Sequence, residues 1–254
     1  MPSVARLSTT VIKSTGLTHP DRLAITRHGV VGDRRFLLTR PDRARLSGLD
    51  KVSLLGVVGA WDGATRMLTV TLPDGSMVAS EPAPVGPPYE QRLYDRTVMV
   101  DQVDHPAIDA LSMRAGRHLI LAEVVPPAHA GGMHPVSLIT TATVDDVGAR
   151  GRSSGPLDAR RFRMTIEIDG AEAYDEDTWS GRRVAIGPVV VRVGDRMPRC
   201  ALTTMDPDTG AKDFPTLHVL APYRRVGNEV LLGVYADVEE PGTVAVGDDV
   251  RVVS

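Results

Sequence analysis

The chain has 254 residues, of which 42% are hydrophobic and 24% charged, so it is long enough for one large or two modest globular domains. Its formal net charge of -3 excludes the strongly basic surface that is typical of nucleic-acid-binding proteins. No stretch resembles a membrane-spanning helix, and residues 1–16 lack the apolar centre of a signal peptide. We therefore expect a cytoplasmic protein with no nucleic-acid or membrane partner.

The first half of the chain predicts short strands that are separated by turns. A lead-in at residues 9–13 precedes strand-like runs at 35–39, 52–61 and 67–72, and Pro73-Asp74-Gly75 forms a turn after them, which predicts a β-meander. Residues 81–88 hold four prolines and predict an extended loop. A strand is expected at 96–100, a short helix at 105–116 that ends at Gly116, and a strand at 118–124.

The second half begins after residues 124–135, whose prolines and glycines predict a linker or an active-site loop. Residues 138–150 predict a helix after a strand-like start, with Thr141 or Thr143 as N-cap and Asp145-Asp146 in the first turn. Beyond an irregular connection at 151–162, strands are expected at 164–168, 184–195, 229–238 and 249–254. Many strands and few helices predict a mainly β fold, a barrel or a sandwich, and not a doubly wound sheet.

The chain contains a single cysteine, Cys200, so neither an internal disulfide nor an all-cysteine metal cluster can form. A lone cysteine is commonly a small buried hydrophobic residue. Here Arg199 precedes it, and Thr203 and Thr204 follow it. A nearby cation and hydroxyl donors favour a thiolate, so Cys200 is the first candidate for a reactive or metal-ligating group.

Several motifs, in a particular order, resemble the MOSC domain family, named for the C-terminal domain of molybdenum-cofactor sulfurase. They are RRFRMTIEIDG (160–170), YDEDTW (174–179), PRCALTTMDPDTG (198–210) and LGVYADVEEPGTVAVGDDV (232–250). Two earlier motifs, KSTGL (13–17) and GDRRFLL (32–38), resemble the β-barrel module that commonly precedes this domain. The resemblance implies a β-barrel-like module at residues 1–117 packed on a MOSC β-barrel at 118–254, with a few short helices.

The resemblance also implies a molybdenum cofactor, in which a pterin dithiolene holds the metal and a protein thiolate supplies a further ligand. Cys200 matches the ligand position, and soft sulfur suits such a metal. The positions that match cofactor-binding residues are Lys13, Ser14, Arg34, Arg163, Arg199 and Tyr235. Because they are far apart in the sequence, a shared role requires the two modules to face each other across a cleft.

These residues also have structural interpretations that the sequence leaves open. Lys13 could be a solvated lysine at a strand end, and Tyr235 could pack in a sheet. Arginines 34 and 163 could form ion pairs with nearby carboxylates, for which the candidates are Asp33, Asp158 and Asp169.

Two acidic segments are interpreted as structural. Residues 206–210, Asp-Pro-Asp-Thr-Gly, have the composition of a turn with side-chain caps, which we favour over a metal or acid–base role for Asp206 or Asp208. The run Asp175-Glu176-Asp177 is expected to cap a helical turn rather than to bind a hard metal ion.

The chain departs from the family pattern around the expected pocket. Residues 47–49 read Ser-Gly-Leu where many relatives have a Thr-Gln-Arg-like element, so an arginine contact is missing. Pro198 stands where the amidoxime-reducing members have a serine, and residues 132–134 read Gly-Met-His in place of Asp-Thr-Ser. His134 is therefore either a proton donor beside the substrate or a loop histidine.

As a function, the resemblance implies an oxidoreductase that reduces small N-hydroxylated compounds at molybdenum. Electrons would come from a separate donor protein, since no iron–sulfur cluster can be built from one cysteine. Two alternatives remain. The chain could be a carrier that binds the cofactor without turnover, or a sulfur-transfer protein with a persulfide on Cys200, a role for which pyridoxal phosphate has also been suggested.

Overall fold

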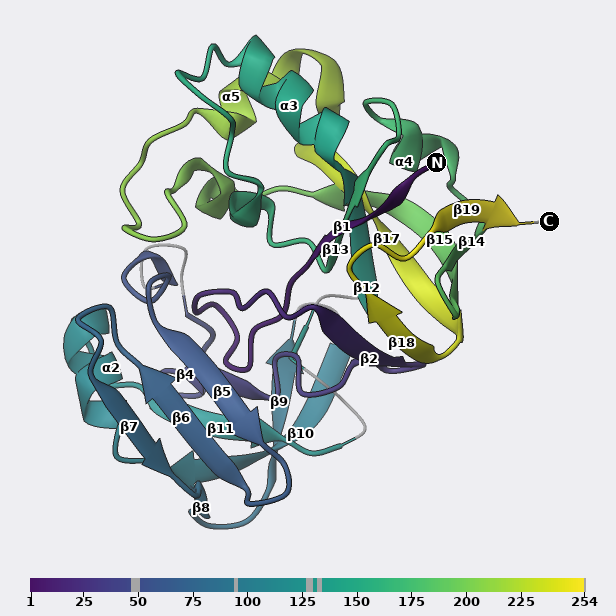
Figure 1. The fold of residues 1–254 in the computed structure, drawn as a ribbon. Coiled ribbons are helices and arrows are strands. Elements are labelled where there is room, and N and C mark those ends of the chain that lie inside the picture. The colour runs from purple at the N-terminus through teal and green to yellow at the C-terminus, as the bar shows by residue number, and fades with distance from the viewer. Residues whose placement is uncertain (47–50, 94–95, 127–129, 132–133, 254) are drawn as a thin grey trace.

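The computed structural model describes residues 1–254 except 47–50, 94–95, 127–129, 132–133 and 254. The chain forms two lobes built mainly of strands, with a few short helices (Figure 1), which confirms the expected fold class. The first lobe holds β4 to β11 and the helix α2, and the second lobe holds the N-terminal strands and everything from β12 onward. Among the described residues, no helix is long and apolar enough to cross a membrane.

A nearly closed sheet forms the second lobe. Its strand order is β1 (Ser3–Leu7), β13 (Ile166–Asp169), β12 (Val136–Thr140), β17 (Glu229–Glu240), β15 (Val189–Pro198), β14 (Arg183–Ile186) and β19 (Val250–Val253), with β16 (Arg225–Val226) paired to β17. A bridge between Ser3 and Asp249 joins the two ends of this order. Alternating valines and isoleucines of these strands fill the interior, as expected for β-branched residues on a pleated surface.

Two sheets and a helix form the first lobe. One sheet contains β4 (Phe36–Thr39), β11 (Ile120–Val124), β10 (Arg96–Asp104), β8 (Ala83–Pro84) and β9 (Tyr89–Leu93); the other contains β5 (Val58–Asp62), β6 (Met67–Thr71) and β7 (Met77–Ser80). The helix α2 (Ile108–Ala115) ends at Gly116 as predicted. Phe36, Leu68 and Leu111 are fully buried between these elements.

The meander prediction is correct for two of its three runs. β5 pairs with β6, and β6 continues into β7. The run at 35–39 forms β4 but pairs with β11 instead of β5, because alternation predicts a strand without specifying its partner. The lead-in at 9–13 is not a strand, and the strand precedes it at Ser3–Leu7.

Helices cover one side of the second lobe (Figure 1): α3 (Thr141–Arg150), α4 (Asp175–Thr178) and α5 (Thr216–Arg224), with short 3₁₀ turns η1 (Ala159–Phe162) and η2 (Ala201–Thr204). The predicted caps of α3 are wrong. β12 runs directly into the helix, so Thr140 is the N-cap, and its hydroxyl oxygen accepts from the Thr143 N–H at 3.2 Å. Residues 145–146 therefore lie beyond the first turn.

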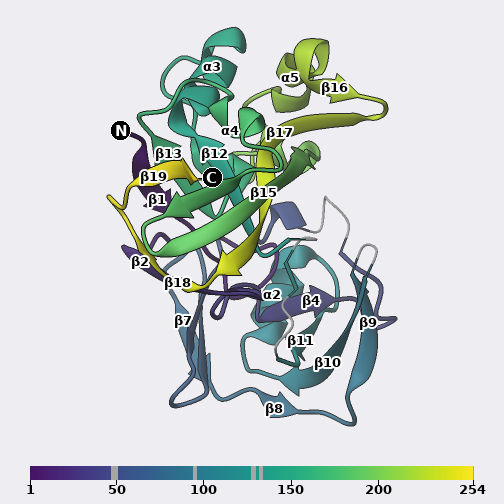
Figure 2. The same ribbon diagram turned by 90° about the vertical axis from the view of Figure 1, so that its right-hand side faces the viewer.

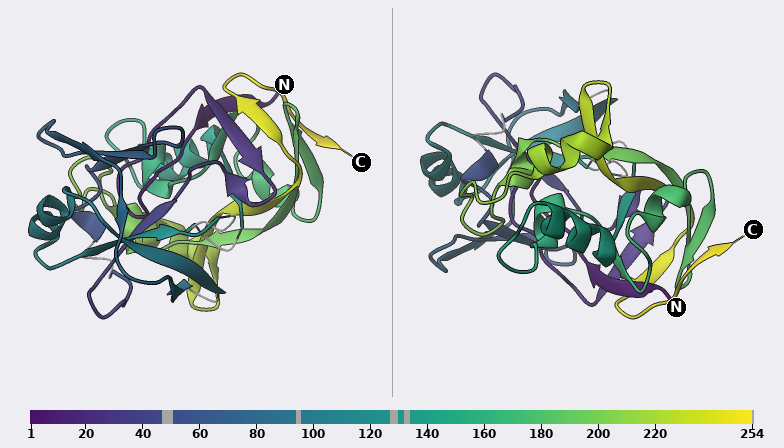
Figure 3. Two further views of the ribbon diagram at one scale, coloured as in Figure 1. Left: turned by 90° about the horizontal axis from the view of Figure 1, so that it is seen from below. Right: turned by 90° about the horizontal axis from the view of Figure 1, so that it is seen from above.

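Strand pairing crosses the predicted module boundary at 117/118 in both directions. β1 pairs with β13, and β2 (Arg22–Thr26) lies between β3 (Gly29–Val30) and β18 (Gly242–Ala245) at the base of the second lobe (Figure 2). Conversely, β11 belongs to the sheet of the first lobe. Both chain ends lie on the same side of the molecule (Figure 3). The division into 1–117 and 118–254 stays a prediction.

Candidate functional site

One irregular segment, residues 8–19, joins the two lobes, and we call it the junction segment. It contacts the second lobe where the Ser8 N–H donates to the Thr165 carbonyl at 2.9 Å. It contacts the first lobe where the Lys13 N–H donates to the Phe36 carbonyl at 2.8 Å. Lys13 and Ser14 therefore lie where the lobes meet, and Ser14 has a left-handed backbone, φ 77°.

Lys13 is not a solvated lysine. Its ammonium group donates to the carbonyl oxygens of Ala130 and Gly131. Burial lowers its pKa well below the ordinary lysine value, and nearby cations lower it further, first of all Arg34. A half-buried amine with several cations nearby is a strong candidate for binding an anion.

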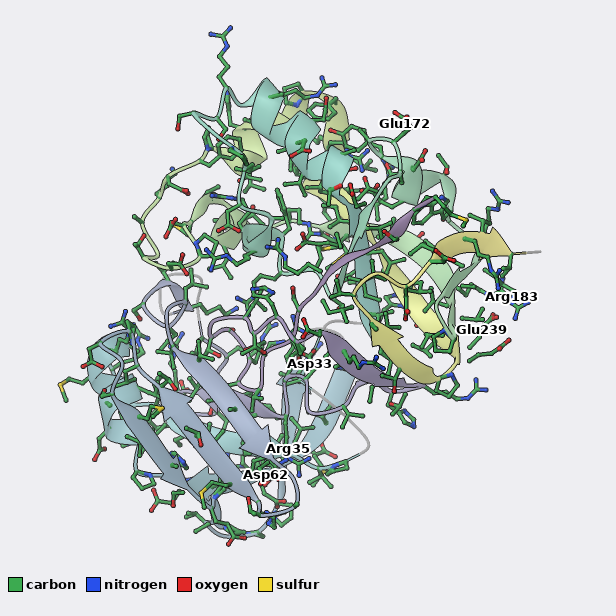
Figure 4. The ribbon with its side chains drawn as sticks, in the orientation of Figure 1. Asp33, Arg35, Asp62, Glu172, Arg183 and Glu239 are labelled. Atoms are coloured by element: carbon green, nitrogen blue, oxygen red, sulfur yellow. The ribbon has the colours of Figure 1, made fainter. Side chains whose placement is uncertain are left out.

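Arg34 forms an ion pair with Asp33, which is the structural interpretation that the sequence left open. Its guanidinium group donates to Asp33 Oδ2. The other oxygen of this carboxylate accepts from the Thr9 hydroxyl at 2.8 Å and from the Thr10 N–H at 2.9 Å, which ties it to the junction segment. Asp33 lies between the two lobes (Figure 4), so Arg34 is held at the same junction.

Arg163 reaches the junction from the second lobe, where its Nη2 donates to the Thr15 carbonyl at 2.8 Å. Burial lowers its pKa to about 10, and the charge of Arg34 contributes to this shift. The expected carboxylate partners are engaged elsewhere: Asp158 accepts from Arg160, and Asp169 accepts from Thr141. Two predicted arginines from different lobes therefore lie close enough to repel each other.

Cys200 is exposed and directly precedes η2. Arg163 and Arg199 both lie close enough to this side chain for a Cys200 thiolate to raise their pKa values. The predicted cations are thus near the sulfur. The predicted hydroxyl donors are not aimed at it: the Thr203 hydroxyl donates to the Cys200 carbonyl and the Thr204 hydroxyl to the Ala201 carbonyl, because η2 turns them back onto the backbone.

The Arg199 guanidinium group is enclosed by protein acceptors. It donates to the carbonyls of Leu232 at 2.8 Å and Phe162 at 2.9 Å, and its Nη2 lies 2.7 Å from Met164 Sδ. Burial lowers its pKa to about 10. Arg199 therefore fastens the Cys200 segment to β17, and its predicted contact with a cofactor stays a prediction.

Tyr235 lies on β17 beside His134. The centroids of the two rings are 4.9 Å apart at 31°, and His134 Nδ1 lies 2.9 Å from Asp237 Oδ1. A Tyr235 phenolate would raise the pKa of Arg199, so these rings are near the cysteine segment. Asp237 was missed in the sequence, although its i, i+2 spacing from Tyr235 places both on one face of a strand.

The other predicted positions have mixed outcomes. Residues 47–49 and 132–133 lie outside the described residues. Asp206 Oδ1 accepts from the Thr209 N–H at 2.7 Å, which confirms the turn at 206–210. Glu176 does not cap α4: it is buried and accepts from the hydroxyls of Thr140 and Thr143, both at 3.0 Å. Burial raises the pKa of Glu176 to about 7.

Two cavities adjoin the junction segment. A small one of about 70 Å³ lies between the lobes and includes Gly16, Arg163 and Asp208 in its lining. A larger one of about 460 Å³ extends into the first lobe, where its lining is Lys13, Ser14, Leu37, Leu38, Arg40, Arg45, Leu46, Lys51 and Leu93. Three of these lining residues, Arg40, Arg45 and Lys51, were not predicted, because no sequence motif marks them.

The donor set suits a large anionic group that accepts one sulfur ligand. The part of the chain that the structure describes has no cluster of three metal-binding His, Cys, Asp or Glu side chains. It does have an exposed thiol near a half-buried arginine, and further cations at the junction between the lobes. A metal held mainly by its own organic cofactor fits these residues, because only a single protein ligand is then needed.

Fold and site together define a two-lobed, mainly β protein with a cysteine next to cations from both lobes. Residues 126–251 match the MOSC domain, and this part of the chain belongs to the MOSC domain family.

Similar proteins include amidoxime-reducing components. Mitochondrial amidoxime reducing component 2 of Rattus norvegicus is 37% identical over 125 residues, which cover 46% of this chain and 36% of the rat protein. Mitochondrial amidoxime-reducing component 1 of Homo sapiens is 34% identical over the same length, with the same coverage. The matched segment thus spans about a third of these relatives.

More distant similarities extend to two other proteins. The molybdenum cofactor sulfurase of Oryza sativa subsp. japonica is 30% identical over 112 residues, which cover 41% of this chain and 13% of that protein. The crystal structure of the YUAD protein from Bacillus subtilis covers 99% of this chain and 96% of its own, at 12% identity and a TM-score of 0.49.

Proposed function

We propose that this protein binds a molybdenum cofactor and reduces small N-hydroxylated compounds with electrons from a separate donor protein. The observation that carries the proposal is the position of Cys200 near Arg163, which in turn lies near Arg34 of the other lobe. The names of the similar proteins, amidoxime-reducing components and a molybdenum cofactor sulfurase, support the same chemistry.

In this proposal the protein supplies binding groups from both lobes. Cys200 gives the metal a thiolate, and Lys13, Ser14, Arg34 and Arg163 hold the phosphate of the pterin. Arginine and lysine suit this task because charge-assisted hydrogen bonds to phosphate are strong. When bound, the cofactor supplies the two-electron redox chemistry. Arg199 keeps Cys200 in position through its bonds to β17 and to the Phe162 carbonyl.

The reduction of an N–OH group to N–H consumes two electrons and two protons and releases one water. Such protons need a donor that works near neutral pH, which favours histidine. His134 is oriented by Asp237 and stacked on Tyr235, so we assign it as the proton donor. Its carboxylate partner would hold the ring orientation.

The test is production of the protein in a host that makes the cofactor, followed by metal and pterin analysis. We expect about one molybdenum and one pterin per chain, as for a site with a single thiolate ligand. With an artificial electron donor, the wild type should reduce an amidoxime to an amidine. Cys200→Ser, which keeps the side-chain size, should abolish this activity.

Other outcomes would contradict the proposal. Bound cofactor without turnover of any N-hydroxylated compound would indicate a carrier. Well-folded protein without molybdenum, but with a persulfide on Cys200 after exposure to a sulfur donor, would indicate sulfur transfer. Activity retained in Cys200→Ser would exclude the thiolate as a ligand.

The role of His134 has its own test. His134→Gln should lower turnover about 100-fold, within the usual range for a general acid, with the molybdenum content unchanged. The matched control is His28→Gln, an exposed histidine in the turn between β2 and β3, which should keep full activity. Unchanged turnover in His134→Gln would remove this residue from the mechanism.

A further inference from the structure

The larger cavity has a lining that separates it from the cysteine site. Two of its residues, Lys13 and Ser14, belong to the predicted phosphate-binding set. The other polar residues of its described lining are Arg40, Arg45 and Lys51 from the first lobe. Cys200 and Arg163 are not among its described lining residues.

The backbone places these cations at one end of β4. The Arg40 N–H donates to the Ala44 carbonyl at 3.0 Å, which closes a tight loop after the strand. A bridge between Thr39 and Arg45 returns the chain to the strand end. Two arginine side chains that are five positions apart thus reach the same cavity.

The described lining contains four cations and no carboxylate. The charged form of Lys13 is disfavoured, because its pKa is lowered first by burial and then by three cations from different segments. These are Arg34, Lys51 and Arg96. The Asp33 carboxylate opposes the shift only in part. Concentrated positive charge of this kind is destabilising until an anion neutralises it.

Arg40 adds an unused donor. Its Nε is buried and has no hydrogen-bond acceptor in the part of the chain that the structure describes. A buried N–H without an acceptor is costly unless a ligand or water supplies one. Because Arg40 lines the cavity, a ligand in the cavity could supply it.

We propose that this cavity binds a small molecule with a pyrophosphate group, of the nucleoside diphosphate class. A nucleoside diphosphate carries about three negative charges, more than a single phosphate does. Four cations therefore match its charge better. Leucines 37, 38, 46 and 93 provide an apolar wall for a planar base. A volume of about 460 Å³ is in the range of ordinary ligand sites. The cavity shares Lys13 and Ser14 with the proposed phosphate site of the cofactor, but the inference does not require molybdenum at Cys200.

The test uses the full chain from a host that cannot make the molybdenum cofactor, titrated calorimetrically with inorganic pyrophosphate and with ADP. We expect saturable binding of both, with ADP tighter because of the leucines. The double variant Arg45→Gln/Lys51→Gln should weaken both at least tenfold. Arg45 is exposed and Lys51 half-buried, and the thermal midpoint of each variant verifies that it folds.

The matched control is Arg27→Gln/Lys212→Gln, which removes the same two charges from exposed positions elsewhere. This control, and Cys200→Ser, should bind both probes like the wild type. Absence of saturable binding to the wild type, or equal affinity in the cavity variant and the control, would overturn the inference. Neither result would bear on molybdenum binding, since the protein used contains none.

A second arm identifies the source of the pyrophosphate group. Mass spectrometry of the small molecules released from protein made in a cofactor-producing host distinguishes two cases. A pterin joined to a nucleotide through pyrophosphate would assign the cavity to an extended cofactor. A pterin monophosphate, with ADP still bound by the loaded protein, would assign it to a separate nucleotide.

Discussion

At the scale of single residues, Glu176 is an ionisable group that the proposed function does not use. It is buried beneath the start of α3, and its Oε1 has no hydrogen-bond partner among the described residues. Burial raises its pKa from 4.5 to about 7, so the folded protein retains a proton that the unfolded chain has lost. Stability therefore falls as pH rises from about 4.5 to 7 and is level above that window.

Glutamine cannot ionise, so the Glu176→Gln variant should not lose this stability. Between pH 5 and pH 8 its free energy of unfolding should therefore rise relative to that of the wild type, by on the order of 2 kcal/mol. Urea unfolding at both pH values measures the difference. Glu229→Gln, the same change at an exposed position, should show no such gain. A Glu176→Gln difference that is the same at both pH values would contradict the raised pKa.

Residue-scale prediction from contiguous motifs named Lys13, Arg34 and Arg163, which lie together at the junction between the lobes, and their binding of a cofactor stays a prediction. It failed for the partners of a side chain: Thr203 and Thr204 were expected to face the thiol but bond to backbone carbonyls. Proximity in sequence does not determine side-chain direction, which depends on the local turn.

At the scale of elements, two glycines with similar backbones have different surroundings. Gly116 ends α2 with φ 67°, and a Cβ added there would meet no atom within 4 Å. Gly210 ends the 206–210 turn with φ 72°, and an added Cβ would lie 2.7 Å from the Val52 carbonyl oxygen. The second glycine thus permits a close contact between the lobes as well as a turn.

Gly116→Ala should cost about 1 kcal/mol of stability, the ordinary price of a left-handed alanine. Gly210→Ala should cost at least twice as much, because a backbone oxygen has to move as well. Chemical denaturation of both variants provides the comparison. Equal losses would mean that the contact between Gly210 and Val52 is not tight in solution.

Element prediction was reliable where short apolar runs are bounded by turn residues, as for β6, α2 and β17. It missed α5, which has a proline inside and a weak amphipathic pattern, and the short strands β2 and β18. Such elements are stabilised by their neighbours rather than by their own sequence.

At the scale of the whole molecule, the two halves of the chain exchange strands. β1 pairs with one edge of β13, and β2 pairs with β18, while β11 belongs to the sheet of the first lobe. Leu7 and Ile25 of the N-terminal strands are buried in the core of the second lobe. Neither half of the sequence therefore contains all strands of its own sheets.

Residues 118–254 expressed alone should accordingly fail to form a cooperative fold, because β13 loses one of its two partner strands, β18 loses β2, and apolar surface is exposed. Calorimetry and binding of a hydrophobic dye measure this, with the full chain as control. Addition of residues 1–117 should restore part of the transition. A sharp unfolding transition of the isolated fragment would instead support an autonomous domain that begins at 118.

The sequence by itself determined the mainly β class, the family and the short list that contains Cys200, Lys13, Arg34 and Arg163, because local composition and contiguous motifs carry that information. Only the tertiary structure decided which strands pair across the chain, that Arg199 is enclosed by carbonyls, and that a second group of cations shares a cavity with Lys13. These features depend on distances between residues far apart in sequence, which no local pattern encodes. The single cysteine is thus one part of a larger cationic region at the junction between the two lobes.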